Sequence, residues 1–274
     1  MGKNFLDIMQ NIKKPNTVRS IVDSLHKLGI MNGDILLVHS SLSSMGWVIG
    51  GDEAVVWALL QAVGETGTLV MPSYTMGNSD PTEYENPPIP VEYHKLLRRE
   101  MLPYNPHTTS TCGMGVIAEK FRTFPNTLRS NHPQTSFCAN GKYAHEITKE
   151  HIFTPQWGMN SPLGKLYGLK AKILLLGVGY NVCTCLHMSE TLSGIVPSIE
   201  KNAAVVINNG EREWICFNDI DWETDDFIKI GKAFEKNHTD NVKRGKIGNA
   251  KCKLFELTAM VNFGIEWIKS NRKY

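Results

Sequence analysis

Apolar residues recur every three or four positions near the start of the chain, which is the spacing of an amphipathic helix. They are Val18, Ile21, Val22, Leu25 and Leu28. Thr17 precedes them and is suited to cap the first turn, and Gly29 follows them and is suited to end the last. We therefore predict a helix over residues 18–28.

A strand, a helix and a second strand are predicted next. Residues 34–39 (Asp-Ile-Leu-Leu-Val-His) and 68–71 are short apolar runs typical of buried strands, and residues 52–63 have a helical pattern. This order predicts a parallel βαβ unit, in which both strands end at the same edge of a sheet. The polar segment 72–90 that follows is long, which favours a functional or a disordered loop.

The rest of the chain mixes helical and extended patterns. Further helices are predicted over residues 91–101, 114–124, 140–150, 187–194, 221–236 and 256–269, and a strongly apolar strand over 172–178. Residues 204–216 predict a hairpin, because Asn209-Gly210 separates two extended segments. Since no repeat or linker divides the chain, we expect one α/β domain over residues 1–274 with a small antiparallel addition near the C-terminus.

Charge and composition exclude several classes of protein. The 29 Lys and Arg residues nearly balance the 27 Asp and Glu residues, and a net charge of +2 gives no general attraction to nucleic acid or to an anionic membrane. The chain starts without an apolar signal segment, and no apolar run approaches the roughly 20 residues of a membrane span. Six scattered cysteines fit free thiols in a reducing compartment. We expect a cytoplasmic protein.

The loop from His39 to Gly51 is rich in serine and glycine, and it lies between a predicted strand and a predicted helix. Small residues let backbone N–H groups approach an anion, and a helix N-terminus adds a favourable dipole. The loop has neither the dinucleotide-binding pattern nor the Gly-Lys-Ser/Thr ending of a phosphate loop. Two interpretations stay open: a site for a phosphate-containing ligand, or a tight turn with a serine-rich surface.

A second candidate is the segment 183–190, Cys-Thr-Cys-Leu-His-Met-Ser-Glu, because active sites of α/β sheets lie in loops after parallel strands. On a helix, Glu190 lies one turn beyond His187, where a carboxylate orients one ring nitrogen and leaves the other free as a base. A surface His–Glu contact has the same spacing. Cys183 and Cys185 also suggest zinc or a thiol nucleophile, but no second pair of metal ligands exists, and thiols beside strand ends usually pack in the core.

Taken in order, a set of motifs resembles the aminoglycoside 3-N-acetyltransferase family over roughly residues 17–270, and in particular its Gram-positive branch. The motifs are Val38-His-Ser-Ser-Leu-Ser-Ser-Met-Gly46 with Gly50-Gly51, Gly67-Thr-Leu-Val-Met-Pro-Ser73, Asp80-Pro81, Gly113-Met-Gly115, Arg129-Ser-Asn-His-Pro133, Asn160-Ser-Pro-Leu-Gly164, Leu174-Leu-Leu-Gly-Val-Gly179, and Thr184 with Leu186-His187 and Glu190. The chain departs from many relatives, which have Asn and Ser at the positions of Cys183 and Cys185.

The resemblance implies an α/β/α sandwich, with acetyl-coenzyme A as the acetyl donor and no metal. It also implies that His187 is the general base and Glu190 its orienting partner. The residues expected along the coenzyme are His39, Ser40, Ser41, Leu42, Ser43, Gly46, Val48, Gly50, Gly51 and, completing the channel, Ser110. Backbone N–H groups of residues 40–43, or Thr184, are candidate donors to the carbonyl oxygen of the thioester.

The acceptor implied by the resemblance is the 3-amino group of the 2-deoxystreptamine ring of an aminoglycoside. Aminoglycosides are polycations and favour nearby carboxylates, which Asp80 and Glu83 in the long polar loop supply, with Tyr74 as a wall. Two alternatives stay open: another amino sugar or small amine is the acceptor, or the protein is a non-catalytic module that binds the coenzyme.

Overall fold

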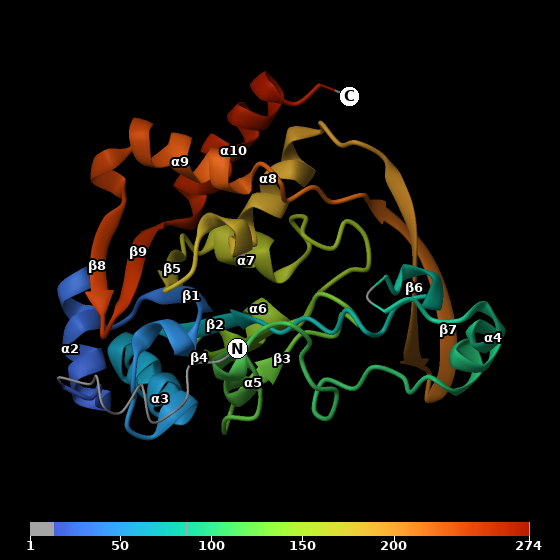
Figure 1. Cartoon of the computed structure of the whole chain (residues 1–274), viewed down its shortest axis with the longest axis horizontal. Coiled ribbons are helices and arrows are strands. Elements are labelled where there is room, and N and C mark those ends of the chain that lie inside the picture. Colours follow the sequence, from blue (N-terminus) through green and yellow to red (C-terminus); the bar gives the residue numbers. More distant parts are fainter. Residues whose placement is uncertain (1–13, 86, 274) are drawn as a thin grey trace.

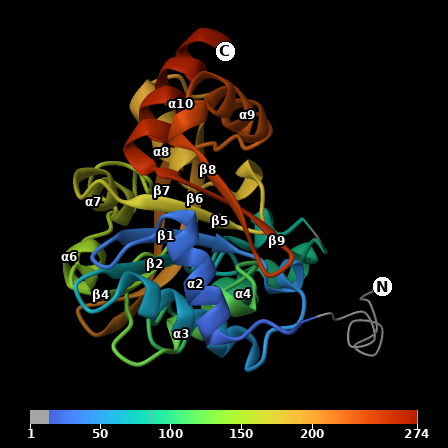
Figure 2. The same ribbon diagram turned by 90° about the vertical axis from the view of Figure 1, so that its left-hand side faces the viewer.

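The computed structural model describes residues 14–85 and 87–273, and its centre is a seven-stranded sheet. The strands are β1 (Ile35–Ser40), β2 (Thr68–Pro72), β3 (Leu128–Arg129), β4 (Phe137–Gly141), β5 (Lys172–Leu176), β8 (Lys243–Ile247) and β9 (Ala250–Glu256). Their order is β3-β4-β2-β1-β5-β9-β8, and helices lie on both faces (Figures 1 and 2). The predicted α/β sandwich is therefore confirmed.

The first half of the sheet forms as its pattern predicts. The pairs β1–β2 and β1–β5 are parallel, and α3 (Gly51–Val63) connects β1 to β2. α2 (Val18–Leu28) has the predicted caps: the hydroxyl of Thr17 accepts the Ser20 N–H, and Gly29 adopts the left-handed conformation at φ 106°. The other pairs of the sheet are antiparallel, which makes it a mixed sheet.

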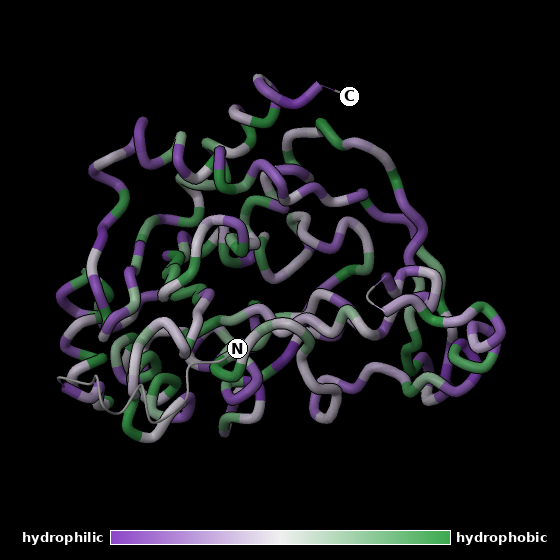
Figure 3. The backbone as a smooth tube through the Cα atoms, in the orientation of Figure 1, coloured by the Kyte–Doolittle hydropathy of each residue, from purple (hydrophilic) through white to green (hydrophobic). Residues whose placement is uncertain are grey.

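Two hydrophobic cores separate the helices into layers, because side chains alternate between the faces of a strand. Leu36 and Val38 of β1 pack with α2, α3 and α5 (Val116–Arg122). Ile35 and Leu37 face the other layer. That layer consists of α6 (Ala144–Thr148), α7 (Pro162–Gly168), α8 (Cys185–Ser193), α9 (Phe227–Asn237) and α10 (Leu257–Asn271). Hydrophobic and hydrophilic stretches alternate along these helices (Figure 3).

The predicted hairpin is present and longer than expected, with β6 (Ile199–Asn208) paired to β7 (Glu211–Ile220). Asn209 and Gly210 form its turn with φ of 49° and 86°. The amide of Asn78 holds the hairpin to the long polar loop, since Nδ2 donates to Val205 O at 3.0 Å and Oδ1 accepts the Val205 N–H at 2.9 Å. The hairpin lies beside the sheet with α4 (Val91–Glu100) on its far side (Figure 1).

Several predicted boundaries were wrong. Residues 140–150 were expected as a helix, but 140 and 141 end β4, and only Ala144–Thr148 is helical. Residues 221–226 form a loop, so that α9 starts at Phe227 instead of at 221. Strands β3, β4, β8 and β9 and helix α7 were not predicted. Basic residues interrupt the apolar pattern of β8 (Lys243, Arg244 and Lys246) and of β9 (Lys251 and Lys253). Among the described residues, no helix is long and apolar enough to cross a membrane.

Candidate active site

A cavity of about 590 Å³ lies where β1, β2 and β5 end. Its wall is made by the last residues of β1 and β2 and the loops after the three strands, by the first turn of α5, and by the start of α8. Within the described part of the chain, this wall contains no lysine, arginine, aspartate or glutamate, and its titratable groups are His39, Tyr74 and His187. The cavity therefore suits the uncharged portion of a ligand.

His187 and Glu190 form the predicted pair on α8. His187 lines the cavity, and its Nδ1 lies 2.7 Å from Glu190 Oε2. Both residues are buried, with 8% of His187 and 1% of Glu190 exposed. Because an ionised carboxylate only accepts hydrogen bonds, it holds the ring hydrogen at Nδ1 and leaves the Nε2 lone pair available. The pair thus has the geometry of an oriented base.

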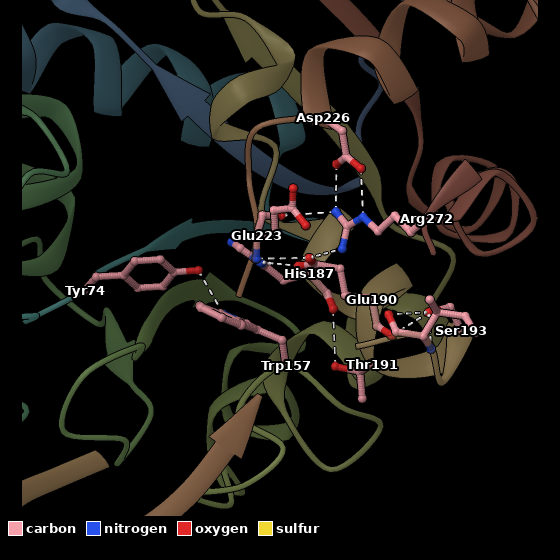
Figure 4. Close-up of polar contacts among 10 residues, drawn as sticks. Tyr74, Trp157, His187, Glu190, Thr191, Ser193, Glu223, Asp226 and Arg272 are labelled. Atoms are coloured by element: carbon pink, nitrogen blue, oxygen red, sulfur yellow. Dashed lines mark hydrogen bonds and ion pairs between the residues drawn. The ribbon is translucent and has the colours of Figure 1, made fainter. Parts of the chain in front are cut away.

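The second oxygen of Glu190 is also engaged. Oε1 accepts a hydrogen bond from Arg272 Nη1 at 2.6 Å and from the Glu223 N–H at 3.2 Å. Arg272 in turn donates to both carboxylate oxygens of Asp226, at 2.7 and 2.6 Å (Figure 4). Burial alone would lower the pKa of Arg272, but the hydrogen bonds to Asp226 and Glu190 outweigh it and raise this pKa. The carboxylate of Glu190 is therefore fixed from both sides.

Aromatic rings enclose the imidazole of His187. The Trp157 ring stacks on it, with centroids 4.0 Å apart and planes 12° apart, and Phe227 and Trp222 approach at 4.9 and 5.5 Å. Trp157 Nε1 donates to the Tyr74 hydroxyl at 3.0 Å, and burial raises the pKa of Tyr74. These contacts hold the ring in one orientation, and a stacked indole favours a cation over a neutral imidazole.

His39 is a second histidine in the wall of the cavity. It is 6% exposed, and its Nε2 is buried without a hydrogen-bond partner among the described residues. Burial lowers the pKa of His39 to about 4, so the ring is neutral near pH 7. A buried polar atom without a partner is costly, and a ligand in the cavity could provide the missing hydrogen bond.

The other residues predicted along the coenzyme divide into two groups. Ser40, Ser41, Leu42 and Ser43 line the cavity, at the end of β1 and in a short 3-10 helix (Leu42–Met45). Those outside its wall are Gly46, Val48, Gly50, Gly51 and Ser110. Val48 packs in the core with α2 and α3, and Ser110 lines a separate cavity of about 560 Å³. Contact of either group with a coenzyme stays a prediction.

The acidic residues predicted for the acceptor lie outside the wall of the cavity, whereas Tyr74 is part of it. Asp80 makes two hydrogen bonds with Arg98, at 2.7 and 2.8 Å, which lower the pKa of its carboxyl group. Glu83 is exposed and accepts a hydrogen bond from the Thr82 hydroxyl at 3.0 Å. Arg98 thus already neutralises Asp80, and the roles of both acids toward an acceptor stay predictions.

The two cysteines near the base are buried, with their sulfur atoms 3.6 Å apart. Burial raises the pKa of Cys185 well above its usual value, which disfavours a thiolate nucleophile. Among the described residues, no group of three or more His, Cys, Asp or Glu side chains is placed to hold a metal ion. The packing interpretation of these thiols therefore fits the structure best.

A buried and oriented histidine beside a cavity without charged side chains among its described residues, at the carboxyl ends of sheet strands, is characteristic of an enzyme that uses a general base. The model of the aminoglycoside 3-N-acetyltransferase family matches residues 37–269. The chain belongs to this family and is an acyltransferase.

Curated relatives and solved structures agree with this assignment. The chain is 42% identical to the aminoglycoside N(3')-acetyltransferase-like protein YokD of Bacillus subtilis, and the match covers 96% of each chain. Its fold is similar to the crystal structure of YokD from Bacillus subtilis, with a TM-score of 0.93 over 97% of this chain and 98% of that one. It is 30% identical to aminoglycoside N(3)-acetyltransferase IX of Micromonospora chalcea, covering 98% and 99%.

Two further similar structures were solved with ligands. One is AAC-IIIb with CoASH, at 26% identity and a TM-score of 0.84, and the other is AAC-VIa bound to sisomicin, at 26% identity and a TM-score of 0.85. Each match covers 95% of this chain and 100% of the other.

Proposed function

We propose that this enzyme transfers the acetyl group of acetyl-coenzyme A to an amine of an aminoglycoside, at the 3-amino group of the 2-deoxystreptamine ring, with His187 as the general base. The observation that carries the proposal is that His187, in the wall of the cavity, is held by the buried carboxylate of Glu190. The family supports the reaction, AAC-IIIb with CoASH supports the donor, and AAC-VIa with sisomicin supports the acceptor.

The cavity suits the uncharged pantetheine arm of the coenzyme. Among the described residues, the wall contains no Lys, Arg, Asp or Glu, and Ser40, Ser41 and Ser43 offer hydroxyl groups. His39 Nε2 has no hydrogen-bond partner in the described part of the chain, and an amide or thioester carbonyl of the ligand would accept a hydrogen bond from it. The phosphates then lie outside this wall, because it contains no cation to pair with them.

In the proposed reaction, His187 accepts the proton of the attacking amine. Acetyl-coenzyme A, when bound, supplies an activated acyl group. An amine attacks that group only when neutral, and at pH 7 most substrate amines carry a proton. His187 Nε2 would take a proton from the amine as the amine nitrogen bonds to the acyl carbon. The bond between that carbon and sulfur would break, and the coenzyme would leave as a thiolate that the proton on His187 neutralises. Glu190 and the face of Trp157 stabilise the imidazolium that results. Such base catalysis contributes about 10²–10⁴ in rate.

Replacement of His187 by Ala tests this role. Thiol release from acetyl-coenzyme A, followed with a panel of aminoglycosides, should fall at least about a hundredfold in kcat while the affinity for the coenzyme is unchanged. The matched control is His145→Ala, since His145 is an exposed histidine on α6. A near-native rate for His187→Ala would contradict the assignment of the base.

The same panel distinguishes the alternatives. Thiol release with other amino sugars or small amines, but with none of the aminoglycosides, would show that the same chemistry has a different acceptor. Binding of acetyl-coenzyme A without turnover of any amine, and without an effect of His187→Ala, would favour a non-catalytic coenzyme-binding module.

A further inference from the structure

We infer that Arg272 is a positioning residue that sets the proton affinity of His187 through Glu190. The inference rests on the proposed function, because it takes His187 as the base. Arg272 itself does not line the cavity; it acts on the base through the carboxylate between them.

All three nitrogen atoms of the Arg272 guanidinium donate hydrogen bonds near the site. Its side chain is 5% exposed and follows the last turn of α10, where the Arg272 N–H bonds to Ile268 O at 2.9 Å. Nη1 donates to Glu190, Nε and Nη2 donate to Asp226, and Nη2 also donates to Glu223 O at 3.1 Å. Arg272 therefore joins α8, the loop before α9 and the end of α10.

This arrangement divides the two oxygens of Glu190 between two partners. Oε2 bonds to His187 Nδ1, whereas Oε1 accepts from Arg272 and from the Glu223 N–H (Figure 4). The carboxylate cannot rotate without breaking charge-assisted hydrogen bonds, so its direction toward the imidazole is fixed. A buried carboxylate without this cation would take up a proton more readily.

The electrostatic effect on His187 follows from the charges around it. On its own helix it faces Glu190, and from the other elements come Arg272, Asp226, Glu223 and the neutral Tyr74 hydroxyl. Arg272 is the one cation in this set of described residues. A positive charge disfavours the imidazolium, so its removal should favour protonation of the ring.

Arg272→Met removes the charge and keeps the length of the stem. Because the base must be neutral to act, the acidic limb of the pH profile of kcat/KM should move up by about one pH unit. Arg272→Lys keeps the charge and should hold the limb near its wild-type position. Asp226→Asn removes a negative neighbour, so it should move the limb in the opposite direction.

A second readout does not need turnover. Titration of His187 by NMR on protein with labelled histidines, with His187→Gln used to assign the signal, should give the same three shifts. The matched control is Lys172→Met, because Lys172 forms a partly buried ion pair with Asp34 at 2.8 Å at the start of β5, away from the strand end that bears the site. It should leave both profiles unchanged.

The outcomes are separable. Unchanged limbs and an unchanged His187 titration in Arg272→Met, or shifts of the same sign in Arg272→Met and Asp226→Asn, would overturn the inference and leave the proposed function standing. If Arg272→Met does not fold, as judged by circular dichroism, Asp226→Asn decides: a limb that stays in place or moves up would overturn the inference, whereas Arg272→Lys should leave the limb in place. Failure of the proposed function appears instead as an active His187→Ala variant, and the NMR titration still tests Arg272.

Discussion

Replacing Glu190 by Gln changes one atom in the site and should remove the base without removing the histidine. In the structure, Arg272 Nη1 and the Glu223 N–H both point at Oε1 of Glu190. The amide oxygen of glutamine must therefore take that position, because an NH₂ group there would face two donors. The NH₂ group then faces His187 Nδ1, 2.7 Å from the present Oε2.

The consequence is the wrong tautomer. An NH₂ donor requires Nδ1 to accept, so the ring hydrogen moves to Nε2, and the lone pair toward the cavity is lost. In serine proteases a comparable change of the orienting acid lowers kcat about 10⁴-fold. We expect a loss of about 10²–10⁴ here, which corresponds to about 2.7–5.5 kcal/mol of activation free energy. The free energy of unfolding should fall by about 1–3 kcal/mol, since a buried charged partner is lost.

The assay is thiol release from acetyl-coenzyme A in the presence of an accepted amine, at a temperature where circular dichroism shows the variant folded. Glu146→Gln, at an exposed position on α6, is the matched control and should keep the wild-type rate. If Glu190→Gln retains its rate within about tenfold while folded, the tautomer argument is wrong.

Two further predictions concern stability. Asn78→Ala should lower the free energy of unfolding by about 1–3 kcal/mol in urea titrations, because the Val205 N–H loses its partner, whereas Asn208→Ala on the exposed end of β6 should have little effect. The thermal midpoint should fall as the pH drops from about 6.5 toward 4. Burial lowers the pKa of His132 to about 4 and that of His151 well below its usual value. In this pH range the unfolded chain therefore takes up protons that the folded chain does not, which favours unfolding. His151→Gln should flatten this dependence, and an equal slope in the variant would contradict the explanation.

The sequence predicted what local patterns determine. The caps of α2 at Thr17 and Gly29, the parallel pair β1–β2, and the turn at Asn209-Gly210 each follow from a few neighbouring residues. The His187–Glu190 pair was also accessible, because both residues lie on one helix, three positions apart.

The rest of the site depends on contacts between distant parts of the chain. Arg272 lies 82 residues from Glu190 and Trp157 lies 83 residues from Tyr74, and no pattern near either residue indicates its partner. The helix predicted from residue 221 concealed a loop that contains Trp222 and Glu223 and ends at Asp226, three residues of the site. The helical pattern of residues 221–226 does not show that tertiary contacts with Glu190 and Arg272 keep this segment out of the helix.

The interior charges around the imidazole have one more consequence. Glu190 and Asp226 place two carboxylates against a single guanidinium, so negative charge predominates there while the imidazole is neutral. Each proton that reaches His187 reduces this imbalance, whereas the departure of that proton restores it. Under the proposed function, a proton taken from an amine would therefore reach a ring beside which the fold has already placed an excess of negative charge.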